Sequence, residues 1–149
     1  LKVLIDAGCR LDGEDFYTGH DAVYHAAEKG RADCLKLLID GNVDVARTWR
    51  VGYGHLPMQM NALHVASWKG HPEVVKLLVA TKKFDVNERA KSYAMFSPLH
   101  FAATEGHADI VKQLLDAGAD KTAVDGRRVI NALQMAEQGK HEAAAAALR

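Results

Sequence analysis

The residues of this chain that could do chemistry are its eight histidines and its two cysteines. Imidazole and thiolate groups bind zinc, and a histidine beside a nucleophile or a carboxylate can act as a general base. His20, His25 and His55 have no cysteine or carboxylate at the spacing of a zinc ligand set or a catalytic triad. The sequence also lacks a Gly-x-Ser-x-Gly motif, a phosphate-binding loop and a paired-carboxylate signature. We therefore expect no enzyme and no catalytic, metal-binding or cofactor-binding residues, although a triad assembled by the fold would leave no mark in the spacing.

Five of the histidines recur at two fixed positions of a repeated pattern, and these are His64, His71, His100, His107 and His141. The pattern is clearest in residues 97–120, where Ser97 is a good N-cap and Pro98 suits the first helical position, because its missing N–H is not needed there. Gly106 can end that helix in a left-handed conformation, and apolar residues at helical spacing mark a second helix that Gly118 ends. The pattern predicts a short helix hairpin whose buried face is too small to fold without neighbours.

Copies of this pattern begin at residues 21, 61, 97 and 131, so successive copies are 40, 36 and 34 residues apart. The chain thereby resembles the ankyrin-repeat family, whose Thr-Pro-Leu-His-x-Ala signature recurs about every 33 residues. The match is best at 97–102, good at 61–66, and weaker at 21–26 and 131–136. The resemblance implies an all-α ankyrin-repeat α-solenoid, in which stacked helix-turn-helix units are connected by β-hairpin-like fingers. We expect a single ankyrin-repeat domain over residues 1–149, with a partial repeat at 1–20, repeats at about 21–60, 61–96 and 97–130, and a C-terminal capping repeat at 131–149.

The ends of the chain and two of its units depart from a regular array. The sequence opens at Leu1 and stops at Arg149 within second helices, so we expect a piece of a longer polypeptide. Tyr24 stands where the family has a bracing histidine, which puts the bracing of that unit in doubt. In the last unit Lys140 stands where the family has glycine, with Gly139 one position earlier. The alanine-rich second helix of this unit offers little apolar area to a further repeat, which suits a terminal cap.

Composition narrows the classes of partner. Nineteen basic residues balance nineteen acidic ones, so no net charge favours binding to nucleic acid or to an anionic membrane surface. No apolar run approaches the ~18 residues of a membrane span, and we expect no membrane insertion. Cys9 and Cys34 are not arranged as a metal-ligand pair or a disulfide framework, which favours a reducing, cytoplasmic or nuclear setting. We expect a buried Cys34 and a monomeric protein.

The resemblance also implies where a partner would bind, since ankyrin fingers and the exposed positions of each first helix line a concave groove. Those helix positions are the two residues before the conserved glycine. Trp68 stands out there because such a position serves no core, although the ring could instead lie over the neighbouring helix. The finger of residues 45–60 adds about seven residues to the length of a standard unit. Its large apolar residues either pack on the adjacent repeat or contact a partner. The expected partner-binding residues are Trp49, Arg50, Tyr53, Trp68, Lys69, Arg89, Lys91, Tyr93, Thr104 and Glu105.

The charges of the fingers predict the character of the partner. The first finger holds acids and no Lys or Arg, whereas the second holds Arg47 and Arg50 and no acid. We therefore expect a groove that runs from acidic to basic, and a protein partner whose acidic segment carries an apolar anchor. The predicted function is protein–protein interaction through this groove and the fingers, without catalysis. Two alternatives stay open: a substrate-recognition ankyrin module of a larger multidomain enzyme, or packing against another domain of the same chain.

Overall fold

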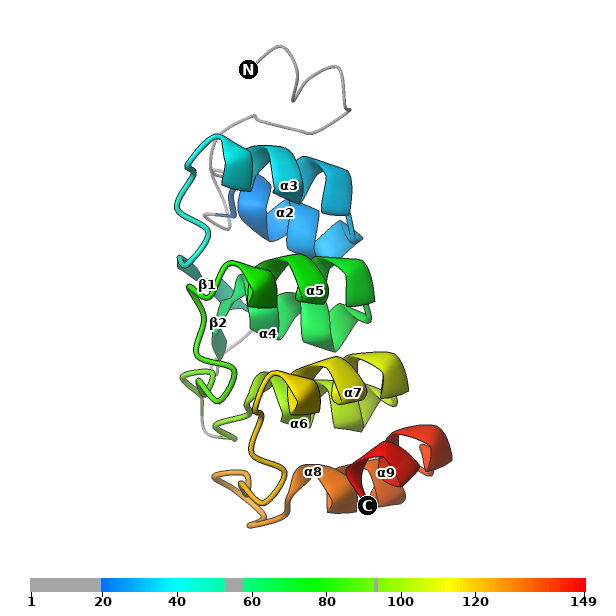
Figure 1. The fold of residues 1–149 in the computed structure, drawn as a ribbon. Helices are drawn as coiled ribbons and strands as arrows, with labels where there is room; N and C mark the ends of the chain where they lie inside the picture. Colours follow the sequence, from blue (N-terminus) through cyan, green and yellow to red (C-terminus); the bar gives the residue numbers. More distant parts are fainter. Residues whose placement is uncertain (1–19, 53–57, 93) are drawn as a thin grey trace.

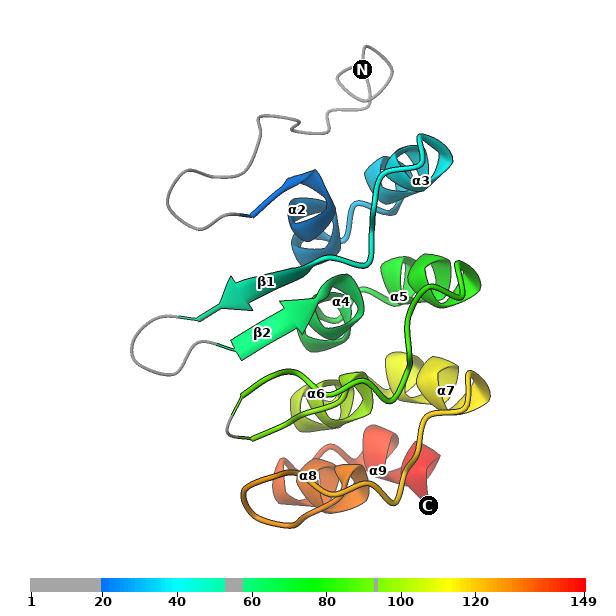
Figure 2. The same cartoon turned by 90° about the vertical axis from the view of Figure 1, so that its left-hand side faces the viewer.

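The structure, a computed structural model, describes residues 20–52, 58–92 and 94–149. In this part of the chain, pairs of helices stack one on the next (Figure 1). The inner helices α2, α4, α6 and α8 form one column and the outer helices α3, α5, α7 and α9 form another (Figure 2). The loops between pairs project to one side of the stack (Figure 2). We call residues 45–60, 88–96 and 124–130 fingers two, three and four. The elements are α2 (Ala22–Lys29), α3 (Ala32–Asp40), β1 (Thr48–Val51), β2 (Met58–Asn61), α4 (Ala62–Lys69), α5 (Pro72–Ala80), α6 (Pro98–Glu105), α7 (Ala108–Asp116), α8 (Ala132–Gln138) and α9 (Glu142–Leu148).

Reciprocal hydrogen bonds start the inner helices. Asn61 Oδ1 accepts from the His64 backbone N–H at 3.0 Å, and His64 Nδ1 accepts from the Asn61 N–H at 3.3 Å. The same capping box joins Asn131 and Gln134 at the start of α8. Because Nδ1 of His64 accepts, its Nε2 carries the proton and donates to the Glu88 carbonyl at 2.8 Å. The histidine therefore fixes the helix start and also ties it to the following finger.

The unit of α2 and α3 starts differently, since Tyr24 replaces the bracing histidine. Asp21 Oδ1 accepts from the backbone N–H groups of Val23 and Tyr24, at 3.0 and 3.1 Å. The Tyr24 side chain is buried, with its ring stacked on His20 at 3.6 Å and edge-to-face with Trp49 at 5.7 Å between centroids. A carboxylate cap and aromatic packing thus brace the unit whose bracing the sequence left in doubt.

The core lies between the two columns and between successive units. Leu63, Leu99 and Leu114 are at most 1% exposed, and alanines such as Ala66 and Ala102 let the inner helices approach closely. The eight described helices are only 7 to 9 residues long. None of them is long and apolar enough to serve as a membrane span.

Cys34 corrects one expectation from the sequence. The side chain lies in α3 and is buried, as expected. It is disulfide-bonded, however, so the prediction of cysteines without a disulfide is wrong for this residue. Cys9 lies outside the described residues. The bond removes the argument that linked the cysteines to a reducing compartment.

The insertion in finger two forms a β-hairpin, in which β1 pairs antiparallel with β2. The hairpin is joined to finger three by a pair of backbone bonds between Gln59 and Lys91, each 3.1 Å long. Finger three is joined to finger four by the bond from the Gly126 N–H to the Ala94 carbonyl, at 2.8 Å. Main-chain hydrogen bonds therefore connect the three described fingers laterally.

The end of α8 differs from those of the other inner helices. Gly30, Gly70 and Gly106 end α2, α4 and α6 with φ of 70° to 81°, whereas Lys140 takes φ of 59° after α8. A side chain with a Cβ disfavours this left-handed conformation. We expect Lys140→Gly to raise the free energy of unfolding by about 1 kcal/mol, as measured by urea denaturation.

The matched control for this prediction is Lys140→Ala, which removes the charged side chain but keeps the Cβ. It should give no such gain. An equal rise in the free energy of unfolding for both variants would show that the lysine side chain, and not the backbone conformation, is the source of the effect.

Candidate functional site

The last turns of the inner helices place a row of side chains along one side of the stack, which we call the groove row. It holds the two residues before each left-handed glycine. In each pair the first residue is half-buried and the second is exposed. Acidic and basic residues lie side by side at its N-terminal end, where Lys29 Nζ is 3.3 Å from Glu28 Oε2. The members of the groove row are Glu28, Lys29, Trp68, Lys69, Thr104 and Glu105.

Trp68 lies in the middle of the groove row. Its half-buried ring packs against Phe101 of α6, with 6.3 Å between centroids. Lys69 Nζ lies 4.0 Å from the centroid of the Trp68 ring, in a cation–π contact. The ring therefore covers the neighbouring helix, as one reading of the sequence had it, and also presents an aromatic surface beside an exposed cation.

Histidines that precede the outer helices hold the backbone of the groove row. Each donates from Nε2 to a carbonyl in the preceding unit: His71 to Glu28 (2.8 Å), His107 to Trp68 (3.2 Å) and His141 to Thr104 (2.9 Å). Gly70 permits this approach, because a Cβ there would lie 2.5 Å from the His107 ring. These three histidines connect units to one another.

His64 and His100 are buried where the inner helices begin. Burial lowers the pKa of His64 to about 4, against the opposing effect of its bond to the Glu88 carbonyl. Burial likewise lowers the pKa of His100, which donates to the Ala123 carbonyl at 3.0 Å. Both rings are therefore neutral at pH 7. Among the residues that the structure describes, no group of three or more His, Cys, Asp or Glu side chains is arranged to hold a metal ion.

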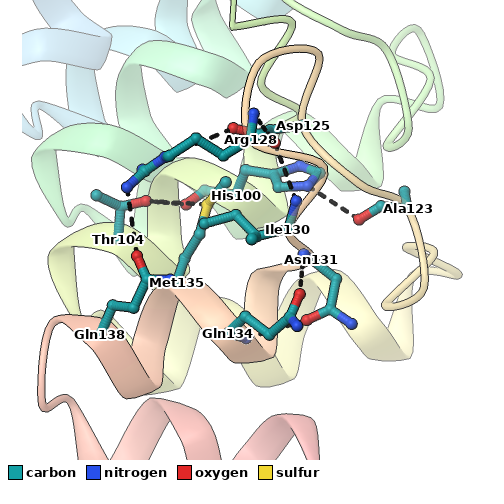
Figure 3. Close-up of polar contacts among 10 residues, drawn as sticks. All are labelled: His100, Thr104, Ala123, Asp125, Arg128, Ile130, Asn131, Gln134, Met135 and Gln138. Carbon is teal, nitrogen blue, oxygen red and sulfur yellow. Dashed lines mark hydrogen bonds and ion pairs between the residues drawn. The ribbon is translucent and has the colours of Figure 1, made fainter.

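Thr104 lies where α6 meets α8 (Figure 3). Its hydroxyl donates to the His100 carbonyl at 2.8 Å and lies 3.4 Å from Met135 Sδ. The half-buried Thr104 side chain is thus engaged within the fold, while the adjacent Glu105 is exposed.

Trp49 lies in strand β1 of finger two and is only 4% exposed. Side chains alternate along β1, so Trp49 and Val51 point inward while Thr48 and Arg50 are exposed. Of the two alternatives for the large apolar residues of this finger, packing within the fold therefore applies to Trp49. We leave Trp49 out of the proposed binding surface. Arg50 stays in that surface, with its carbonyl accepting from His20 Nε2 at 3.1 Å. The expected contact residue Tyr53 lies outside the described residues.

In finger three the two expected basic residues have different roles. Arg89 is half-buried, and its Nη1 donates to the Val124 carbonyl at 2.8 Å, which ties finger three to finger four. Lys91 is exposed and uses its main chain in the bridge to finger two. Tyr93, also expected to contact a partner, lies outside the described residues.

A family model described as ankyrin repeats (3 copies) matches residues 1–90 and 59–125. The chain belongs to the ankyrin-repeat family. This confirms the resemblance and the predicted ankyrin solenoid. Ankyrin repeats are generally modules of protein–protein interaction, and the family is typically non-catalytic. The chain is also similar to "Ankyrin repeat protein nuc-2" of Neurospora crassa, with 34% identity over 83 residues, which are 56% of this chain but only 7% of that protein.

Sequence reasoning did not single out three residues, the buried Phe101 and the exposed Met95 and Val129. Phe101 supports the Trp68 ring, and its place in the signature, directly after His100, could have indicated this. Met95 and Val129 are large apolar side chains on fingers three and four, 45% and 69% exposed. Each stands two residues before a helix N-cap, a regularity that is visible in the sequence.

Proposed function

We propose that this ankyrin-repeat domain binds a partner protein through the groove row and the fingers, and that it catalyses no reaction. The observation that supports this most is the pair Trp68–Lys69, with Lys69 Nζ 4.0 Å from the ring centroid. Tryptophan offers a large rigid apolar area, and a partner that covers it would also desolvate the adjacent cation. Aromatic anchors of this kind carry much of the free energy of protein interfaces.

The partner that we propose is an acidic segment with an apolar anchor. An apolar side chain would cover the Trp68 ring, and carboxylates would face the exposed Arg50, Lys69 and Lys91. Such charges steer association and fix the orientation of the partner. Since Trp49 is buried, Trp68 is the aromatic anchor of this surface among the described residues.

The experiment is to capture partners from a cell extract with the immobilised domain, identify them by mass spectrometry, and titrate the purified partner against variants. Trp68→Ala should weaken binding about thirtyfold or more, equivalent to roughly 2 kcal/mol. Because Trp68 also packs on Phe101, the thermal melt of each variant is recorded, and binding is measured well below the melting temperature.

Two further variants complete this test. Lys112→Ala changes an exposed position of α7 and should leave the affinity unchanged. Arg50→Glu should slow association and reduce its dependence on salt concentration. If the Trp68→Ala and Arg50→Glu proteins both bound the partner as tightly as the wild type does, the groove row and finger two would be the wrong surface. The outer helices would then be tested next.

The alternative function, substrate recognition for a larger multidomain enzyme, would use the same surface, with the substrate as the partner. Identification of the captured partner distinguishes the two, because a substrate would be chemically altered by the full-length protein. The monomeric state and the cytoplasmic or nuclear location stay predictions. Size-exclusion chromatography and imaging of the full-length protein would test them.

A further inference from the structure

Two exposed apolar side chains occupy the same position on neighbouring fingers. Met95 and Val129 each stand two residues before the N-cap of an inner helix, Ser97 and Asn131 respectively. With Val43, they are the large hydrophobic side chains that are exposed in the part of the chain that the structure describes. Both have a left-handed backbone, with φ of 50° at Met95 and 58° at Val129.

This conformation is unfavourable for both residues. Glycine adopts positive φ readily, whereas a bulky side chain does not, and a β-branched residue such as Val129 is a clear outlier there. Neither side chain offsets this by packing in the core, because Met95 is 45% and Val129 69% exposed. Among the described residues, the other non-glycine residues with positive φ, Asn42, Lys82 and Lys140, each stand two residues after the last residue of a helix, whereas Met95 and Val129 do not. Residues held in disfavoured conformations are common at functional sites, which makes this pair a candidate for one.

The surrounding hydrogen bonds hold Val129 in place from both sides. Asp125 Oδ1 accepts from the backbone N–H groups of Arg128 (2.9 Å) and Ile130 (3.0 Å), the two neighbours of Val129 (Figure 3). The Asp125 N–H also donates to the Ile130 carbonyl at 2.8 Å. Asp125 itself is only 3% exposed. The backbone of Val129 is therefore fixed by its neighbours, while its side chain faces solvent.

Met95 is held in a comparable way. The carbonyl of Ala94 accepts from the Gly126 N–H, and that of Phe96 accepts from the Ala90 N–H, both at 2.8 Å. Since Gly126 belongs to finger four, the same bond that fixes Met95 also joins the two fingers. Met95 and Val129 thus project from two loops whose backbones are hydrogen-bonded to each other.

The charges around these side chains are mainly positive. Fingers three and four contain Arg89, Lys91, Arg127 and Arg128 against two acids, Glu88 and Asp125. Lys91, Arg127 and Arg128 are exposed. Glu88 is also exposed, and its Oε2 accepts from Asn61 Nδ2 at 2.8 Å, whereas Asp125 is buried, with Oδ2 4.0 Å from Arg128 Nε. A partner that covered this surface would have to supply the negative charge as well as an apolar contact.

We infer that the tips of fingers three and four form a docking surface for an acidic, apolar segment of a partner protein, anchored by Met95 and Val129. The inference rests on the proposed function, because it names Met95 and Val129 as the apolar anchors on the finger part of the surface proposed there. It adds contacts that lie on different elements from Trp68, so each region can be tested without the other.

The test uses Met95→Gly, Val129→Gly and the double variant of the full chain. Glycine relieves the left-handed backbone, so each single variant should raise the melting temperature, by roughly 2 °C. The binding probe is a peptide selected on the wild-type protein from a phage-displayed library of random peptides. Selected peptides should be rich in Asp and Glu beside large apolar residues, and the double variant should bind them at least about tenfold more weakly.

Val43→Gly is the matched control, because it also removes an exposed apolar side chain, but from a position whose φ is not positive. It should not raise the melting temperature and should leave peptide binding unchanged. A higher melting temperature together with weaker binding in the finger-tip variants supports the inference, since general destabilisation cannot produce both.

Three outcomes would overturn the inference: no rise in melting temperature, undiminished peptide binding by the double variant, or no selected peptide of acidic and apolar composition. The groove row is judged separately with Trp68→Ala. Peptides that lose binding in Trp68→Ala but keep it in the double variant would support the groove row and reject the finger-tip surface. The reverse result would reject the groove row and support the finger tips.

Discussion

Leu114→Ala is expected to lower the free energy of unfolding by about 2–5 kcal/mol. Leu114 is 0% exposed in α7, which packs against α6 within its unit and against α5 and α9 of the neighbouring units. A cavity there weakens two interfaces between units as well as the core of one unit. The stability of a repeat array depends on such nearest-neighbour interfaces, so the substitution should lower the stability of the whole stack. Leu99→Ala, at a 1% exposed position of α6, should have a loss in the same range.

Denaturant melts followed by circular dichroism give these free energies directly. Lys112→Ala is the control on the same helix as Leu114, and it should change the free energy of unfolding by less than about 0.5 kcal/mol. Losses below about 1 kcal/mol for both leucine variants would mean that neither residue lies in the core to which we assign it.

Acid is expected to destabilise the fold through His64, by about 2 kcal/mol between pH 7.5 and pH 5. The pKa of His64 is lowered by burial from 6.5 to about 4. Between these values the unfolded chain takes up a proton at His64 and the folded chain does not. The contribution to stability is therefore complete above pH 6.5 and is lost as the pH falls towards 4. His100, whose pKa burial also lowers, adds to the effect in the same direction.

The measurement is a series of urea melts from pH 7.5 to pH 5, on the wild type and on His64→Gln. Glutamine is the replacement that the chain itself offers, because Gln134 accepts from the N-cap N–H of α8 at 2.9 Å, as His64 does at the start of α4. His64→Gln should be less stable at neutral pH, yet its stability should fall less steeply with acid. Parallel pH profiles for the two proteins would contradict the assignment of this effect to His64.

The helices could be predicted from the sequence because their boundaries are set by residues within a single turn. Ser97 and Pro98 start α6, and the left-handed Gly106 ends it. The positions of Trp68 and Lys69 follow from the same local rule, since they come directly before Gly70. Such features need no knowledge of the neighbouring units.

The fingers were less predictable because side-chain direction there depends on contacts between units. A shift of one residue in the register of β1 would exchange Trp49 with Arg50 between the buried and exposed faces, and the sequence of an insertion does not fix that register. The bond from Arg89 to the Val124 carbonyl depends likewise on where finger four lies. Val129 was missed because a β-branched residue gives no signal of positive φ, which is fixed here by Asp125.

The bond from His107 to the Trp68 carbonyl has a consequence for binding entropy. A side chain at a frayed helix end must be immobilised when a partner binds, at about 0.5–1.5 kcal/mol for each flexible side chain. The turn that carries Trp68 is instead already held by the following unit, as those of Glu28 and Thr104 are by His71 and His141. The backbone at Glu28, Trp68 and Thr104 is thus held by the next unit along the chain, and loosening that unit is expected to weaken the proposed binding at a residue that it does not contain.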